Sequence, residues 1–159
     1  KGAEVTALDF SAGMLDQGRK QHKDIKFVQG DALKLPFSEN TFDVTTISFG
    51  LRNTANSNIA LREALRVTKV GGKIVVAEFS HPVNKIFRRA YLNYLMKALP
   101  IIAKRISKNP AAYIYLSESI RAWPDQAGLA LIMSECGWKS VAWQDLTFGI
   151  VAVHIGYKA

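Results

Sequence analysis

The chain of 159 residues contains a single cysteine, Cys136, so it forms no internal disulfide and gives no sign of an oxidising compartment. No apolar run reaches the length of a membrane-spanning helix, because the longest candidate, residues 91–106, is interrupted by basic residues and Pro100. Internal repeats and low-complexity tracts are also missing. With 48% hydrophobic and 21% charged residues, the composition is that of one soluble, globular domain, which we place at residues 1–159.

Acidic residues are absent between Glu78 and Glu118, although the net charge of the chain is +8 and seven basic residues lie within 85–108. Large apolar side chains recur between these charges at helical spacing. A basic helix with an apolar face suits an anionic membrane surface, or a pocket for an apolar substrate near one. The plain alternative is a helix packed on the domain with its basic face in water. Nucleic acid would fit the charge too, but the apolar side chains between the charges favour the other two interpretations, and we expect no nucleic-acid partner.

Strand-like and helix-like segments alternate along the chain, which predicts an α/β fold with a mostly parallel sheet. Between residues 147 and 149 only a short connection separates the last two strands, so we expect them to form an antiparallel hairpin. We also expect a basic and apolar helical insertion at about 83–120. The strands are expected over 5–9, 25–29, 42–47, 73–79, 138–145 and 150–157, and further helices over 14–21, 58–68 and 124–136.

The stretch Thr41–Asn53 is the segment around which the rest of the predicted fold is arranged. Residues 42–47 are β-branched and apolar, the composition of a strand buried on both faces. The strand ends in the polar and flexible run Ser48-Phe49-Gly50-Leu51-Arg52-Asn53. Ligands of open α/β sheets bind beyond the carboxyl ends of the strands, so this run is a candidate edge of an active site. The alternative is a simple turn at Gly50 with Arg52 in water.

Polar residues also follow the two preceding strands. Asp9 ends the first strand and has the type and position of an acid that accepts both hydroxyls of a ribose, although a lone acid there is also a common helix cap. Asp31 and Ala32 follow the second strand, where side chain and backbone are suited to the edge of an adenine. Together with Ser48 on the third strand, these residues predict a nucleoside-containing cofactor along the sheet edge.

Six segments of the chain carry specific motifs: LDFSAGML (8–15), GDALKLPF (30–37), FDVTTISFGLRN (42–53), RVTKVGGKIVVAEFS (66–80), YLSESIRAWPDQ (115–126) and LTFGIVAVHIGYKA (146–159). They resemble the motifs of class I S-adenosylmethionine-dependent methyltransferases, and more narrowly those of the ubiquinone/menaquinone C-methyltransferase family. ISFGLRN and the R-V-x-K-x-G-G…E-F-S run are the most specific, and the likeness covers essentially the whole chain. Thr68, Val70 and Trp123 depart from the family pattern, and Trp123 flanks the expected substrate site.

The resemblance implies S-adenosylmethionine as the cofactor, with contacts at Asp9 to the ribose, at Asp31 and Ala32 to the adenine, and at Ser48. It implies methylation of a ring carbon of a polyprenylated quinol, either demethylmenaquinol or a benzoquinol of the ubiquinone pathway. It is compatible with a cytoplasmic enzyme peripheral to the inner face of the membrane, and a homodimer is one assembly to consider. The histidines are scattered without ligand spacing, so no metal site is expected.

Such a reaction needs a phenolic hydroxyl to lose its proton before the ring carbon becomes nucleophilic. Within the resemblance, Arg52 would stabilise the phenolate, Asn53 would orient the ring and Asp125, beside Gln126, would be the base.

Each of these assignments has an alternative. Glu78 and His81 form a second acid–base pair of candidates at the end of the following strand. Arg52 could instead pair with Asp125 or Glu118, and His81 before a proline could simply shape a turn.

The family's first strand and its glycine-rich loop would lie upstream of Lys1. We therefore expect the sheet to lack its middle strand, between residues 5–9 and 42–47, and to expose two open strand edges.

Three other functions fit parts of the sequence. A nicotinamide-dependent oxidoreductase would also use Asp9, but the chain has no placed Tyr-x-x-x-Lys pair. Its G-x-G-x-x-G motif would lie upstream, so the absence of that motif here does not decide, and competition between nicotinamide and sulfonium cofactors would. A nucleic-acid methyltransferase would need Asn/Asp-Pro-Pro-aromatic, where this chain has Ser-Phe-Gly. A noncatalytic membrane-binding module is the third.

Overall fold

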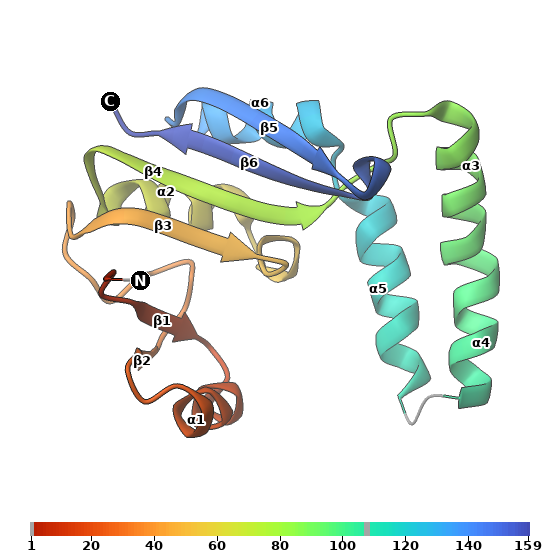
Figure 1. Ribbon diagram of the computed structural model, residues 1–159, viewed down its shortest axis with the longest axis horizontal. Coiled ribbons are helices and arrows are strands. Elements are labelled where there is room, and N and C mark those ends of the chain that lie inside the picture. Colours follow the sequence, from red (N-terminus) through yellow and green to blue (C-terminus); the bar gives the residue numbers. More distant parts are fainter. Residues whose placement is uncertain (1, 107–108) are drawn as a thin grey trace.

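The computed structural model describes residues 2–106 and 109–159 of the chain, so Lys1 and the last basic residue of the insertion, Lys108, lie outside the described residues (Figure 1). The strands are β1 Thr6–Asp9, β2 Lys26–Gln29, β3 Phe42–Ser48, β4 Thr68–Phe79, β5 Lys139–Leu146 and β6 Val151–Tyr157. The helices are α1 Ala12–Gln21, α2 Ser57–Val67, α3 Lys85–Asn93, α4 Leu99–Ile106, α5 Pro110–Ala122 and α6 Gln126–Glu135, with the short segments η1 Leu51–Asn53, η2 Tyr94–Ala98 and η3 Thr147–Gly149.

These elements confirm the alternation of strands and helices expected from the sequence, although several boundaries differ by one or two residues and the start of β4 differs by five. Strand β4 begins at Thr68 rather than at residue 73, because the chain pairs with β3 directly after α2 and accommodates the extra residues in a register shift. The hydroxyl of Thr68 is buried yet satisfied, since it donates to the Ala64 carbonyl at 2.7 Å. Helix α6 begins at Gln126, after Asp125 as its N-cap, so Pro124 precedes the helix.

The strands form two sheets in the described part of the chain, β1-β2 and β3-β4-β6-β5. The pairs β1–β2 and β3–β4 are parallel, whereas β6 lies antiparallel to both β4 and β5. The expected sheet, mostly parallel with a terminal antiparallel hairpin, is therefore confirmed: β3, β4 and β5 run in one direction, and only β6, which lies between β4 and β5, runs in the other. The two sheets separate between β1 and β3, the place where the sequence led us to expect a missing strand.

The core lies between one face of the larger sheet and the helices α2 and α6, which Figure 1 shows behind that sheet. Trp138, with 1% of its surface exposed, is its largest side chain, and its indole nitrogen donates to the Leu61 carbonyl at 3.1 Å. Side chains of β4 alternate accordingly, with Ile74 and Val76 fully buried on the helix side.

Strand β3 is not buried on both faces, as its composition led us to expect. Asp43, Val44 and Thr46 are exposed, and Val44 keeps 43% of its surface in contact with solvent. The reason lies in its surroundings: β3 pairs with β4 alone among the described strands, and the helices cover only the opposite face of its sheet. A run of β-branched and apolar residues predicts that a segment forms a strand. Whether the strand is buried depends on the elements that pack on it.

The insertion is a helical hairpin in which α3, η2 and α4 run along α5 and extend away from the sheets (Figure 1). Asn84 caps α3 by accepting from the backbone nitrogens of Ile86 and Phe87 at 2.9 and 3.1 Å. Pro110 begins α5, where its missing N–H is not needed. Of the described helices, none combines the length and the apolar character that crossing a membrane requires.

The loop between β2 and β3 is held against α2 by one ion pair. Arg66 binds both carboxylate oxygens of Glu63 at 2.8 Å and donates to the Phe37 and Leu35 carbonyls at 2.8 and 3.0 Å. Glu63 completes this clamp by accepting from the Leu35 nitrogen at 2.8 Å. The residues of the smaller sheet are thereby tied to the larger one through side chains of α2.

We expect acid to weaken this clamp. The hydrogen bond from Arg66 lowers the pKa of the Glu63 carboxyl below its usual value, so the unfolded chain binds the proton more readily. The stabilisation is complete above the unfolded-state pKa, about pH 4.3, and is lost as pH falls through the lower folded-state pKa. Urea unfolding at pH 7 and pH 3.5 should show a smaller acid-induced loss of stability in Glu63→Gln than in the parent protein. An equal loss in both proteins would contradict this prediction.

Candidate active site

The ends of β1 and β2 bring Asp9 and Asp31 to one edge of the smaller sheet. The Gly30 nitrogen donates to the Asp9 carbonyl at 3.1 Å. A Cβ at Gly30 would lie 2.9 Å from a methyl group of Leu8 and 3.1 Å from Pro36 Cδ, so a side chain there would require these neighbours to shift. The parallel pairing of β1 with β2 places the two acidic residues at neighbouring strand ends.

Both acidic side chains are exposed, and each uses an oxygen to fix its own turn. Asp9 Oδ1 accepts from the Ser11 nitrogen at 2.7 Å, while Asp31 Oδ1 accepts from the Leu33 nitrogen at 2.8 Å. The cap of α1 is Ser11, whose hydroxyl accepts from the Met14 nitrogen, so Asp9 is not itself the cap. The turns orient both carboxylates before any ligand binds.

Ala32 links this edge to the core, and Ser48 ends strand β3 of the larger sheet. Ala32 packs against the main core cluster, to which Leu51 of η1 also belongs. Ser48 is the exposed last residue of β3, and the chain turns sharply after it because Phe49 adopts a positive φ of 54°. The Phe49 nitrogen nevertheless donates to the Ala77 carbonyl at 2.8 Å, so the turn stays attached to β4.

Arg52 does not extend into water. Its side chain is 8% exposed and its Nη1 donates to Glu78 Oε1 at 2.6 Å, so the pairing considered with Asp125 or Glu118 is wrong. Nη1 also donates to the Phe49 carbonyl at 2.9 Å, and the guanidinium carbon lies 4.9 Å from the centre of the Phe79 ring. Nε is buried and has no acceptor within the described residues, which leaves hydrogen-bonding capacity for a ligand.

Asn53 follows Arg52 on η1 and is exposed. Its Nδ2 donates to the Phe49 carbonyl at 3.3 Å, and its Oδ1 accepts from the Tyr115 hydroxyl at 3.2 Å. Tyr115 belongs to α5, so the helical hairpin reaches the end of β3 through this contact. Tyr115 could not be recognised as a site residue from the sequence, because only the tertiary structure brings α5 to η1.

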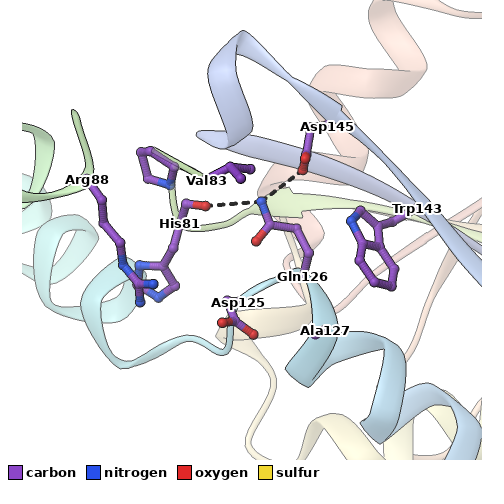
Figure 2. A pocket seen from close by; sticks show the side chains of 9 residues that line it. His81, Val83, Arg88, Asp125, Gln126, Ala127, Trp143 and Asp145 are labelled. Carbon is purple, nitrogen blue, oxygen red and sulfur yellow. Dashed lines mark hydrogen bonds between the residues drawn. The ribbon is translucent and has the colours of Figure 1, made fainter. Parts of the chain in front are cut away.

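Asp125 lies in a different environment, a cavity of about 300 Å³ at the start of α6 (Figure 2). Its Oδ1 accepts from the Gly128 nitrogen at 3.0 Å as the helix cap. Beside it, Gln126 donates to the His81 carbonyl and to Asp145 at 3.0 and 2.8 Å. Of the described residues, those that line the cavity do not include Arg52 or Asn53: they are His81, Pro82, Val83, Arg88, Asp125, Gln126, Ala127, Trp143 and Asp145.

Two buried histidines border the same region. His154 Nε2 lies 2.9 Å from the Gln126 carbonyl, which can only accept, so this nitrogen carries the proton. Burial lowers the pKa of His154, which favours the neutral ring. His81 Nε2 bonds in the same way to the Trp123 carbonyl at 2.9 Å. Both rings therefore help to hold α5 and α6 against the sheet.

Comparison with known proteins places this arrangement in a family. The model of the ubiE/COQ5 methyltransferase family matches residues 1–158. The chain belongs to this family.

Similar sequences are the demethylmenaquinone methyltransferases of Paenarthrobacter aurescens, Renibacterium salmoninarum and Streptomyces avermitilis. They are 55%, 57% and 54% identical to this chain over 99% of its length. The chain spans 62%, 66% and 68% of the length of these curated relatives.

Solved structures support the fold. The chain is similar to the CMeT domain of the citrinin polyketide synthase, with a TM-score of 0.71 and 16% identity over 98% of this chain and 39% of that one. It is also similar to a structure described as a complex of the Haloferax volcanii Trm112 methyltransferase activator and a putative methyltransferase, with a TM-score of 0.70 and 16% identity over 97% of this chain and 71% of that one. The class I methyltransferase fold expected from the sequence motifs is confirmed.

Proposed function

We propose that the protein carrying this chain transfers a methyl group from S-adenosylmethionine to a ring carbon of a polyprenylated quinol, with demethylmenaquinol as the substrate. The observation that carries the proposal is the buried and oriented Arg52, which lies at the end of β3 in a member of the ubiE/COQ5 methyltransferase family. The names of the relatives favour the naphthoquinol over the benzoquinol. Methylation of the benzoquinol of the ubiquinone pathway is the second candidate.

The residues at the two sheet edges fit the cofactor. Asp9 and Asp31 are exposed, preoriented carboxylates, which are suited to ribose hydroxyls and to the amino group of adenine. Ala32 and Ser48 would complete the contacts at the ends of β2 and β3. When bound, S-adenosylmethionine supplies an electrophilic methyl group on a sulfonium.

Arg52 would act on the quinol. A cationic guanidinium held near a ring hydroxyl stabilises the phenolate, which makes the neighbouring ring carbon nucleophilic. Asn53, fixed by Phe49 and Tyr115, would orient the ring. Asp125 remains our candidate for the base, and Gln126 beside it holds the wall of the cavity.

The central test is methyl transfer to reduced demethylmenaquinone, measured by mass spectrometry of the extracted quinone. We expect a product heavier by one methylene, and a loss of about a hundredfold in kcat for Arg52→Gln, because one oxyanion donor is worth about 3 kcal/mol in a preorganised site. Arg62→Gln, on the exposed side of α2, is the control and should remain active.

Three outcomes would contradict the assignment: no transfer to naphthoquinol or benzoquinol, unchanged kcat in Arg52→Gln, or displacement of S-adenosylhomocysteine by a nicotinamide dinucleotide.

We also propose peripheral contact with the inner face of the membrane through an apolar tip, defined as Val83, Ile86, Phe87 and Phe148. Ile86 and Phe148 have 83% and 82% of their surface exposed, and the rings of Phe87 and Phe148 lie 5.9 Å apart. Phe148 also holds a positive φ of 58°, an unusual conformation for an aromatic residue. The basic residues Lys85, Arg88 and Arg89 are interspersed with the apolar residues on α3. Apolar side chains flanked by positive charge suit an anionic lipid surface.

Sedimentation with phospholipid vesicles tests this contact. We expect binding to vesicles that contain phosphatidylglycerol, weaker binding at high salt, and a loss of about tenfold or more for Phe148→Ser, because burial of one large apolar side chain contributes about 1.5–3 kcal/mol. Leu131→Ser is the matched control, since Leu131 is 60% exposed on α6. Equal loss in the control, or no preference for anionic vesicles, would contradict the proposal.

A further inference from the structure

The carboxylate of Glu78 is the most deeply buried acidic group that contacts the candidate active site. Glu78 lies next to the end of β4 and has 1% of its surface exposed. Oε1 accepts from Arg52 Nη1 at 2.6 Å and from the Phe79 nitrogen at 2.9 Å. Oε2 accepts from the Arg52 backbone nitrogen at 3.3 Å. Both oxygens are therefore occupied by donors from the protein.

These contacts argue against proton transfer by Glu78, which the sequence analysis considered. An acid or base must reach the substrate within hydrogen-bond distance, whereas this carboxylate is enclosed and already paired. A buried charge is costly unless it is paired, so the guanidinium and the carboxylate depend on each other. The carboxylate holds Arg52 at two points, its side chain and its backbone.

We propose that Glu78 is a positioning residue for Arg52 in methyl transfer, which rests on the function proposed above. By binding the backbone nitrogen it fixes η1 against β4, and by binding Nη1 it fixes the guanidinium over the Phe79 ring. Asn53 follows on the same short segment, so its hydrogen bonds to Phe49 and Tyr115 form only when η1 is in place.

Glu78 has two opposing effects on kcat, so the direction in which kcat changes when Glu78 is replaced tests the proposal. Its negative charge weakens the field of Arg52 at a phenolate, so removal of the charge alone would raise kcat. Its hydrogen bonds orient Arg52, so their loss would lower kcat. Positioning predicts the second result.

The kinetic test compares Glu78→Gln, Arg52→Gln and the double variant in the intact protein. We expect kcat to fall about tenfold to a hundredfold in Glu78→Gln, as misplacement of a catalytic group costs this much, with the KM for S-adenosylmethionine within about twofold of the parent. In the Arg52→Gln background the same change should alter kcat by less than about twofold. Asp43→Asn breaks the exposed pair with Lys69 (2.9 Å) at the opposite end of β3, and should leave kcat unchanged.

An unchanged or raised kcat in Glu78→Gln, or the full loss persisting in the Arg52→Gln background, would overturn the proposal. If the parent protein methylates no quinol, the proposed function fails, and a spectroscopic test then decides the role of Glu78.

That test is nitrogen-15 NMR of the Arg52 guanidinium. A guanidinium held through Nη1 rotates slowly, so we expect separate Nη resonances in the parent protein and averaged ones in Glu78→Gln. Averaged resonances in the parent protein would overturn the proposal. This measurement on the parent needs no variant, so it remains decisive if Glu78→Gln does not fold.

Discussion

The buried ion pair of Arg52 and Glu78 is the interaction on which the candidate active site depends. It joins the segment after β3 to the end of β4, and it forms only because the parallel register places Ser48 opposite Ala77. That register brings η1 directly over the next residue of β4, Glu78. The proposed reaction calls for a base or a cation near the ring hydroxyl, and this fold supplies a guanidinium that Glu78 and the Phe49 carbonyl hold in place.

A second constraint is the division between β1 and β3. The smaller sheet carries Asp9 and Asp31, whereas the larger carries Ser48 and Arg52, so the proposed site draws on both. The two sheets are connected by the loop that Glu63 and Arg66 clamp to α2, and by the packing of Ala32 on the core. The proposed cofactor residues lie on both sheets, since Ser48 belongs to β3, so the proposed site depends on this link between them.

Much of the fold could be predicted from local sequence. Alternating apolar segments indicated the strands, and the short connection at Phe148 indicated the terminal hairpin, because hydrophobic periodicity and loop length are local properties. The exposure of Val44 could not be predicted, since it depends on which elements cover β3. The antiparallel insertion of β6 between β4 and β5 is likewise a property of the whole sheet.

The residues of the candidate site were likewise predictable only where local sequence determines their position. The strand-end positions of Asp9, Asp31 and Ser48 followed from the rule for open α/β sheets. The partner of Arg52 could not be predicted, because Glu78 lies twenty-six positions further along the chain and several acids were equally plausible partners. Asp125 was identified by its neighbours in sequence, yet the structure uses it to cap α6, in a cavity whose described lining does not include Arg52.

The most direct test of the account is hydrogen–deuterium exchange of the intact protein with and without S-adenosylhomocysteine. If the ends of β1, β2 and β3 form one cofactor site, the ligand should slow exchange of backbone amides at 9–11, 30–33 and 48–53 together. Slower exchange in only one of the two sheets, or only within the hairpin of α3, α4 and α5, would contradict it.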